Sequence, residues 1–61
     1  MPHINIQMLA GATREQKAEV VKEITATMAR VLGKKPEHTN IVFQEIEDED
    51  WGFGGVLCDE P

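Results

Sequence analysis

The sequence predicts an α/β (α+β) fold: a strand, a helix and a second strand form one β-α-β unit, followed by a β-hairpin or loop. Residues 2–8 alternate apolar and polar side chains, as a strand with one covered face does. Residues 14–32 repeat apolar side chains at helical spacing, and residues 39–46 are rich in β-branched and aromatic residues. A helical crossover of this kind makes the two strands parallel.

The first strand begins at Pro2 and carries Ile4, Ile6 and Met8 on one face. If Met1 is removed, the nitrogen of Pro2 becomes a free secondary amine in place of an amide. A free amine can accept a proton, so Pro2 is a candidate catalytic base. The alternative is that the Met-Pro start has no chemical role.

The helix is expected over residues 14–32 because local signals mark both of its ends. Thr13 and Gln16 have the spacing of a capping box, in which each side chain accepts from the backbone of the other. Gly33 is a natural C-terminal stop, and Pro36 prevents continuation. The apolar stripe of the helix consists of Val20, Val21, Ile24, Met28, Val31 and Leu32.

The second strand is expected over residues 39–46, buried on much of both faces. Two parallel strands cannot stand alone in water, so we expect another chain to extend the sheet. Residues 47–50 form an acidic turn, which is interpreted as a solvated loop without a metal. Residues 51–55 combine two aromatic rings with three glycines, which favours a small hairpin or a loop that reaches a neighbouring subunit.

Length and composition narrow the class of protein. The 61 residues are expected to form one domain, residues 1–61, near the lower size limit for a core within one chain. The net charge of −5 argues against a nucleic-acid partner, which needs a basic surface. Cys58 is the one cysteine, which excludes an intrachain disulfide and suits a cytoplasmic protein. Neither a signal segment nor an apolar run long enough to cross a membrane is recognised.

In their order and spacing, these residues resemble the 4-oxalocrotonate tautomerase family of the tautomerase superfamily. The resemblance spans nearly the whole chain and is carried by Pro2 behind Met1, Gly11 before the segment 13–17, Pro36, and residues 51–55. It implies a β-α-β subunit that forms dimers with a four-stranded sheet, three of which assemble into a homohexamer. It also implies an enzyme without a metal or organic cofactor.

The implied activity is that of an isomerase, a keto-enol tautomerase acting on a small enol or 2-oxo acid with Pro2 as general base and acid. A free α-amine has a reference pKa of about 7.7 to 8.0, and a secondary amine is more basic. Desolvation and nearby cations would lower the pKa of Pro2 toward the working pH. Trp51 and Phe53 are expected to wall the pocket; for Trp51 the alternative is packing at a subunit interface.

Two positions depart from the family's pattern. Well-studied members carry substrate-binding arginines where this chain has Ala12 and Asn40. Neither side chain can make a charge-assisted bidentate contact, so a dicarboxylate substrate is not expected. Asn40 can donate a neutral hydrogen bond to a substrate oxygen or can simply begin the strand. Arg14 can reach the pocket or remain an exposed residue of the first helical turn.

Two further hypotheses stay open. A hydratase-like or dehalogenase-like relative would use protonated Pro2 as an acid, with Glu45 or the acidic turn orienting a water molecule. A non-catalytic subunit would instead pair with a different, arginine-bearing chain in a mixed hexamer, which the lost arginines suggest.

Overall fold

The computed structural model describes residues 1–61 and confirms the β-α-β prediction. Two short 3₁₀ segments were not predicted: η1 lies between α1 and β2, and η2 lies between β2 and β3. The C-terminal segment is a hairpin, which decides between the two forms expected from the sequence. In chain order the elements are β1 (His3–Leu9), α1 (Arg14–Leu32), η1 (Pro36–His38), β2 (Asn40–Ile46), η2 (Asp48–Asp50), β3 (Gly52–Phe53) and β4 (Val56–Leu57).

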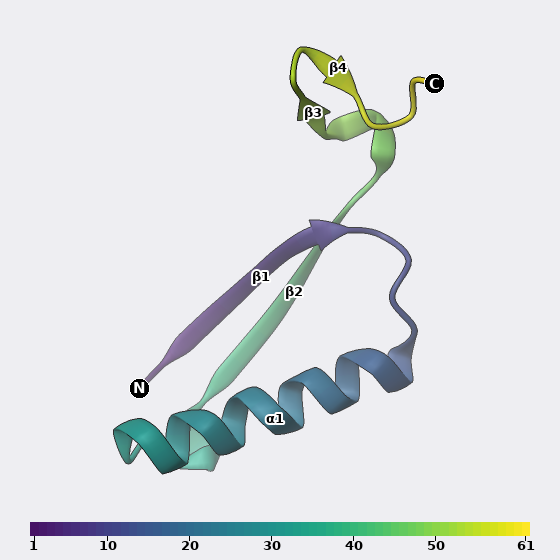
Figure 1. The fold of residues 1–61 in the computed structure, drawn as a ribbon. Coiled ribbons are helices and arrows are strands. Elements are labelled where there is room, and N and C mark those ends of the chain that lie inside the picture. Colours follow the sequence, from purple (N-terminus) through teal and green to yellow (C-terminus); the bar gives the residue numbers. More distant parts are fainter.

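β1 and β2 pair in parallel, and α1 lies along one face of this two-stranded sheet (Figure 1). The register runs from His3 opposite Asn40 to Leu9 opposite Ile46. Alternate side chains are half-buried toward the helix along β1 and along β2 as far as Phe43, while those between them are exposed. The alternation breaks at the end of β2, where Glu45 is exposed and Ile46 is half-buried. The half-buried side chains of this layer are Ile4, Ile6, Met8, Ile41 and Phe43 from the sheet, and Val21, Ile24 and Met28 from α1.

Both predicted ends of α1 are confirmed, because the local signals form the expected contacts. Thr13 Oγ1 accepts from the N–H of Gln16 at 3.1 Å, and Gln16 Oε1 accepts from the N–H of Thr13 at 2.9 Å. At the other end Gly33 has a φ of 67°, a left-handed conformation that suits glycine. The helix therefore begins just after the chain leaves β1 and ends just before the chain turns back toward β2.

The second face of the sheet is open. Two of its four residue pairs are wholly polar, His3–Asn40 and Gln7–Gln44, and Val42 remains 43 % exposed there. The expectation that the second strand is covered on both faces is therefore wrong within one chain, because α1 covers only one face. No residue of the chain is fully buried. Extension of the sheet by another chain stays a prediction.

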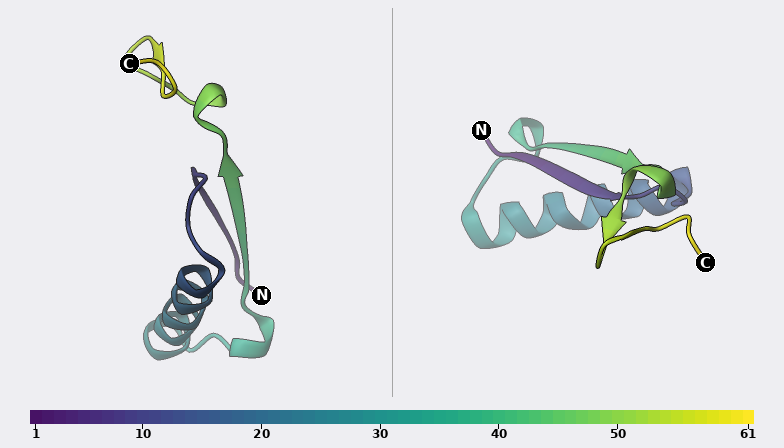
Figure 2. Two further views of the ribbon diagram at one scale, coloured as in Figure 1. Left: turned by 90° about the vertical axis from the view of Figure 1, so that its right-hand side faces the viewer. Right: turned by 90° about the horizontal axis from the view of Figure 1, so that it is seen from above.

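The β3–β4 hairpin extends beyond the end of the sheet, away from the N-terminus and most of α1 (Figures 1 and 2). Its turn is formed by Gly54 and Gly55, with φ of 60° and 87°, which a two-residue hairpin turn of this hand requires. The N–H of Cys58 donates to the carbonyl of Trp51 at 2.9 Å and closes its base. The long dimension of the molecule, 44 Å, reflects this extension.

Candidate functional site

Pro2 lies at the amino end of β1 and is half-buried. The backbone N–H of Asn40 donates to the carbonyl oxygen of Pro2 at 3.0 Å, so the start of the chain is tied to β2. Met1 is 86 % exposed and makes no hydrogen bond. Removal of Met1 would therefore leave the proline ring anchored through its carbonyl while freeing its nitrogen.

Asn40 is the predicted site residue that the structure brings next to Pro2. It begins β2 opposite His3, on the sheet face that α1 does not cover. Its side-chain amide is exposed and makes no hydrogen bond within the chain. The amide is thus free to donate to an oxygen bound near Pro2, which stays a prediction. Asn40 also begins β2, as the alternative interpretation expected.

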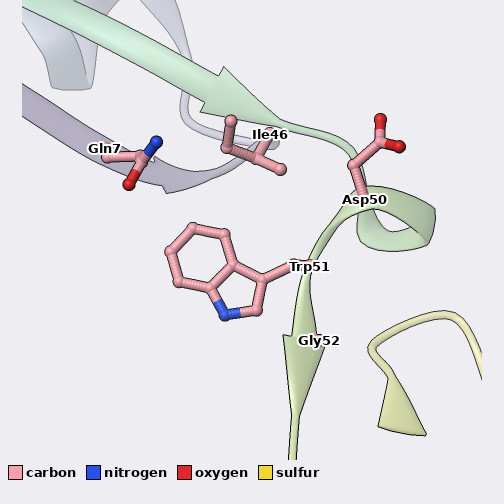
Figure 3. A pocket seen from close by; sticks show the side chains of 5 residues that line it. All are labelled: Gln7, Ile46, Asp50, Trp51 and Gly52. Carbon is pink, nitrogen blue, oxygen red and sulfur yellow. The ribbon is translucent and has the colours of Figure 1, made fainter.

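Trp51 lies at the opposite end of the sheet, where it lines a shallow open cavity of about 210 Å³. Its indole ring lies next to Gln7 and Ile46, while the carboxylate of Asp50 points away from the ring (Figure 3). Gly52 completes the lining. The cavity offers apolar and amide surface, but within one chain it does not include Pro2.

The other predicted site residues lie at this second end as well. Phe53 is 77 % exposed on the hairpin, and Arg14 opens α1 directly after the turn that follows β1. The seven residues of β2 span roughly 20 Å, which separates these residues from Pro2. One chain therefore unites Pro2 with Asn40 and leaves Trp51, Phe53 and Arg14 at the other end.

The side chain of Glu45 contacts two residues of its own chain at this second end. Its Oε2 accepts from the N–H of Gly11 at 3.3 Å, and its Oε1 pairs with Lys17 Nζ. The two paired side chains are 30 % and 27 % exposed. Glu45 thus holds the turn after β1 against β2, far from Pro2, and no observation supports a water-orienting role for it.

Some residues come together because of how β1 and β2 are aligned, and these were not identified from the sequence. Gln7 and Ile46 line the cavity because β1 and β2 end side by side, and Met8 stands opposite Glu45 on the helix-facing side. The alternation of residues 2–8, combined with parallel pairing of the strands, could have shown which of these side chains lie on the same face of the sheet. No three His, Cys, Asp or Glu side chains gather into a possible metal site, and no helix is both long and apolar enough to cross a membrane.

Comparison with known proteins gives consistent matches along the whole chain. Residues 2–60 match the family model described as tautomerase enzyme. A protein of Dickeya dadantii, named as a probable tautomerase, is 38 % identical over 61 residues, covering 98 % of this chain and 91 % of the relative. A 2-hydroxymuconate tautomerase of Comamonas testosteroni is 30 % identical over 60 residues, covering 98 % and 95 %.

Solved structures agree with these sequence matches. A 4-oxalocrotonate tautomerase homologue superimposes with a TM-score of 0.93 at 31 % identity, covering 100 % of this chain and 98 % of the other. A heterohexamer 4-oxalocrotonate tautomerase from Chloroflexus aurantiacus superimposes with a TM-score of 0.89 at 30 % identity, covering 98 % and 97 %. The resemblance seen in the sequence is confirmed: this chain belongs to the tautomerase enzyme family.

Proposed function

We propose that this chain is a cofactor-independent tautomerase that interconverts the enol and keto forms of a small 2-oxo acid, with Pro2 as the proton carrier after Met1 is removed. The observation that carries the proposal is the placement of Pro2. It heads the strand at the edge of the sheet and is held by the hydrogen bond from Asn40, and the family match begins at this residue. Fixing the amine in this way reduces the freedom that a proton transfer must otherwise overcome.

The reaction moves one proton and leaves the substrate composition unchanged. The neutral amine of Pro2 takes the proton from the enol hydroxyl and leaves an enolate, whose oxygen carries the negative charge. The resulting ammonium then gives the proton to the far carbon of the carbon-carbon double bond, whose electron pair forms the new C–H bond as the carbonyl double bond forms. The side-chain amide of Asn40 donates a hydrogen bond to the oxygen that carries negative charge between these two steps.

The walls of the site come from other copies of the chain. Trp51 and Phe53 lie beyond the far end of β2, whose length of roughly 20 Å separates them from Pro2 of their own chain. Phe53 is on the hairpin that extends away from the sheet, and Trp51 lies at the base of that hairpin. A homohexamer of three dimers would let the hairpin of one copy cover Pro2 of another. Removing water from the amine favours its neutral form, which is the form that a base needs.

The substrate carries one carboxylate in this proposal. Ala12 and Asn40 offer no cation, and Lys17 is already paired with Glu45. Arg14 is exposed at the start of α1 and is the candidate that a second copy would bring to a carboxylate. A dicarboxylate would leave one charge without a bidentate partner.

Ketonisation of phenylenolpyruvate by the purified chain tests the proposal, with Pro2→Ala as the variant. The alanine amine is primary, lacks the ring that restricts its motion, and keeps the backbone carbonyl that Asn40 contacts. General acid–base catalysis contributes about 10² to 10⁴-fold, and we expect kcat/KM to fall by a large part of that range. Intact mass confirms removal of Met1 in both samples. Equal rates for the two proteins would refute the catalytic role of Pro2.

A second candidate is a subunit of a mixed hexamer that pairs with an arginine-bearing chain. It is favoured by the absence of cations at Ala12 and Asn40 and by the similarity to the heterohexamer of Chloroflexus aurantiacus. In that case the purified chain, with Met1 removed, shows no ketonisation activity alone. An active homohexamer rules out this candidate.

A further inference from the structure

Removal of Met1 would leave three nitrogen donors within the first two residues of the chain. They are the amine of Pro2, the backbone nitrogen of His3 and a ring nitrogen of the His3 imidazole. Only one of the three belongs to a side chain, so they form no cluster of His, Cys, Asp or Glu side chains. Sets of nitrogen donors bind the divalent ions late in the first transition series.

The imidazole of His3 is available to a ligand. His3 opens β1 on the sheet face that α1 does not cover, and its side chain is exposed. It makes no hydrogen bond or ion pair within the chain, and its neighbour across the sheet is the neutral Asn40. A ring nitrogen of His3 can therefore bind a ligand without breaking a contact.

The backbone N–H of His3 points away from β2. The carbonyl of Pro2 belongs to the same peptide unit, accepts from the N–H of Asn40 and so faces β2. In a trans peptide the N–H and C=O groups point in opposite directions, and the chain has no cis peptide bond. β1 has no partner strand on its other side within the chain. The backbone nitrogen of His3 is thus open to a ligand.

The ring of Pro2 can turn toward these two atoms without disturbing the hydrogen bonds of the sheet. The N-terminus projects from the start of β1 (Figure 1). Rotation about the bond between Cα and the carbonyl carbon of Pro2 moves the ring and the amine, while the carbonyl keeps its 3.0 Å hydrogen bond to Asn40. Once Met1 is absent, no residue before the ring has to follow. The cost is the packing of a half-buried ring.

We propose that the N-terminus freed by removal of Met1, Pro2-His3, binds one Cu(II) ion per chain through these three nitrogens and thereby blocks the amine of Pro2 as a base. Square-planar nitrogen sites are typical of Cu(II) and Ni(II), and Cu(II) binds most tightly among the divalent metals of this series. The inference rests on the proposed function for the removal of Met1 and for the role of Pro2. It adds a ligand that the proposed reaction does not use.

Binding exchanges protons for the metal and changes no oxidation state. The ammonium group of Pro2 and the backbone amide of His3 each lose a proton, and the imidazole binds in its neutral form. The lone pair of the amine, which a base needs, then lies in the bond to copper. The net charge of −5 favours the approach of a cation. Copper binding and proton transfer at Pro2 therefore exclude each other.

Retention of Met1 removes the site for a reason of covalent structure. The nitrogen of Pro2 is then a tertiary amide, which has no proton to lose and no free lone pair for a metal. His3 keeps its imidazole and its own N–H, but the chelate lacks its terminal donor. The step that frees the base thus also creates the copper site.

Titration with CuCl₂ tests the site, followed by the visible absorption of bound Cu(II) and by the rate of phenylenolpyruvate ketonisation. The parent protein for all measurements carries Cys58→Ser, because the exposed thiol would itself bind and reduce copper. We expect the absorption to reach its limit at one equivalent of Cu(II). At that point kcat/KM should have fallen by about tenfold or more, because the amine no longer accepts a proton.

Three further proteins identify the ligands. His3→Ala removes the ring nitrogen, and protein produced while methionine aminopeptidase is inhibited retains Met1 and lacks the amine. In both, the Kd for Cu(II) should rise by more than the roughly 10 to 100-fold that loss of an outer-shell contact costs. His38→Ala removes the other histidine of the chain, which is exposed, and should titrate as the parent protein does. Intact mass verifies the N-terminus of each protein.

Unaltered copper binding by His3→Ala or by the protein that retains Met1 overturns the inference, and so does a parent protein that binds no copper. Pro2→Ala still has an amine, the amide and the imidazole, so it should bind copper as the parent does while having little activity. If copper binds at this site and the rate does not fall, Pro2 is not the base, and the proposed function fails while the copper site stands. The two failures are therefore observed separately.

Discussion

The contacts of Glu45 predict how the turn after β1 contributes to stability. Glu45→Ala removes the ion pair with Lys17 and the hydrogen bond accepted from Gly11. A partly exposed ion pair contributes about 0.2 to 1 kcal/mol, and a hydrogen bond about 0.5 to 1.5 kcal/mol. At 3.3 Å and partly in water, the bond to Gly11 belongs in the lower part of that range. The free energy of unfolding should therefore fall by about 1 to 2 kcal/mol.

Two milder variants separate the contributions. Glu45→Gln keeps an oxygen that can accept from Gly11 but loses the charge, and Lys17→Met removes the cation while retaining an unbranched apolar chain. Each should cost about 0.5 kcal/mol, and the double variant should cost little more than either alone. Urea unfolding at one fixed protein concentration measures these differences, since assembly makes stability depend on concentration.

Two results would refute the reasoning about Glu45. If Glu45→Ala and Glu45→Gln are equally stable, the contact with Gly11 contributes nothing. If the effects of Glu45→Gln and Lys17→Met simply add, the ion pair contributes nothing. Activity is a further measurement. The turn lies far from Pro2 of the same chain, so these substitutions should not change kcat/KM through that chain's own site. A change in kcat/KM at full assembly would indicate that this turn reaches a site on another copy.

Three smaller predictions follow from the helix ends and from Asn40. Thr13→Ala should lower the free energy of unfolding by about 1 kcal/mol, because it removes the N-cap; Thr27→Ala, at an exposed mid-helix position, should not. Gly33→Ala should lower it by about 1 kcal/mol, because alanine disfavours the left-handed conformation; equal thermal midpoints would contradict this. Asn40→Ala should lower kcat/KM by roughly tenfold with normal sedimentation, because a donor to the charged oxygen is lost, and an unchanged rate would dismiss that donor.

The helix could be predicted to the residue because its ends depend on neighbours in sequence. Thr13 and Gln16 form the capping box within one turn, and Gly33 supplies the left-handed conformation at the other end. The hairpin was left open between two forms, since the sequence shows the glycines but not which pair will turn. Gly54 and Gly55 do so because Phe53 can then pair with Val56 across the hairpin.

The site was predictable only where local sequence determines it. Pro2 and Asn40 lie together because they stand at the starts of two strands that run in parallel, while their roles in catalysis stay predictions. The contact between Glu45 and Lys17 depends on the register of β2 and on the rotation of α1, which no local pattern encodes. The separation of Trp51 from Pro2 is likewise a consequence of topology.

That topology explains why one chain by itself does not enclose Pro2. The 19 residues of α1 rise about 28 Å, enough to return the chain from the carboxyl end of β1 to its amino end. β2 must then start beside Pro2, which brings Asn40 to it, and must end at the far edge, which carries Trp51 away. An aromatic wall over Pro2 within one chain would need antiparallel strands, and a helical crossover of this length does not produce them. The same helix that brings β2 beside the candidate base therefore leaves that base without an aromatic wall from its own chain.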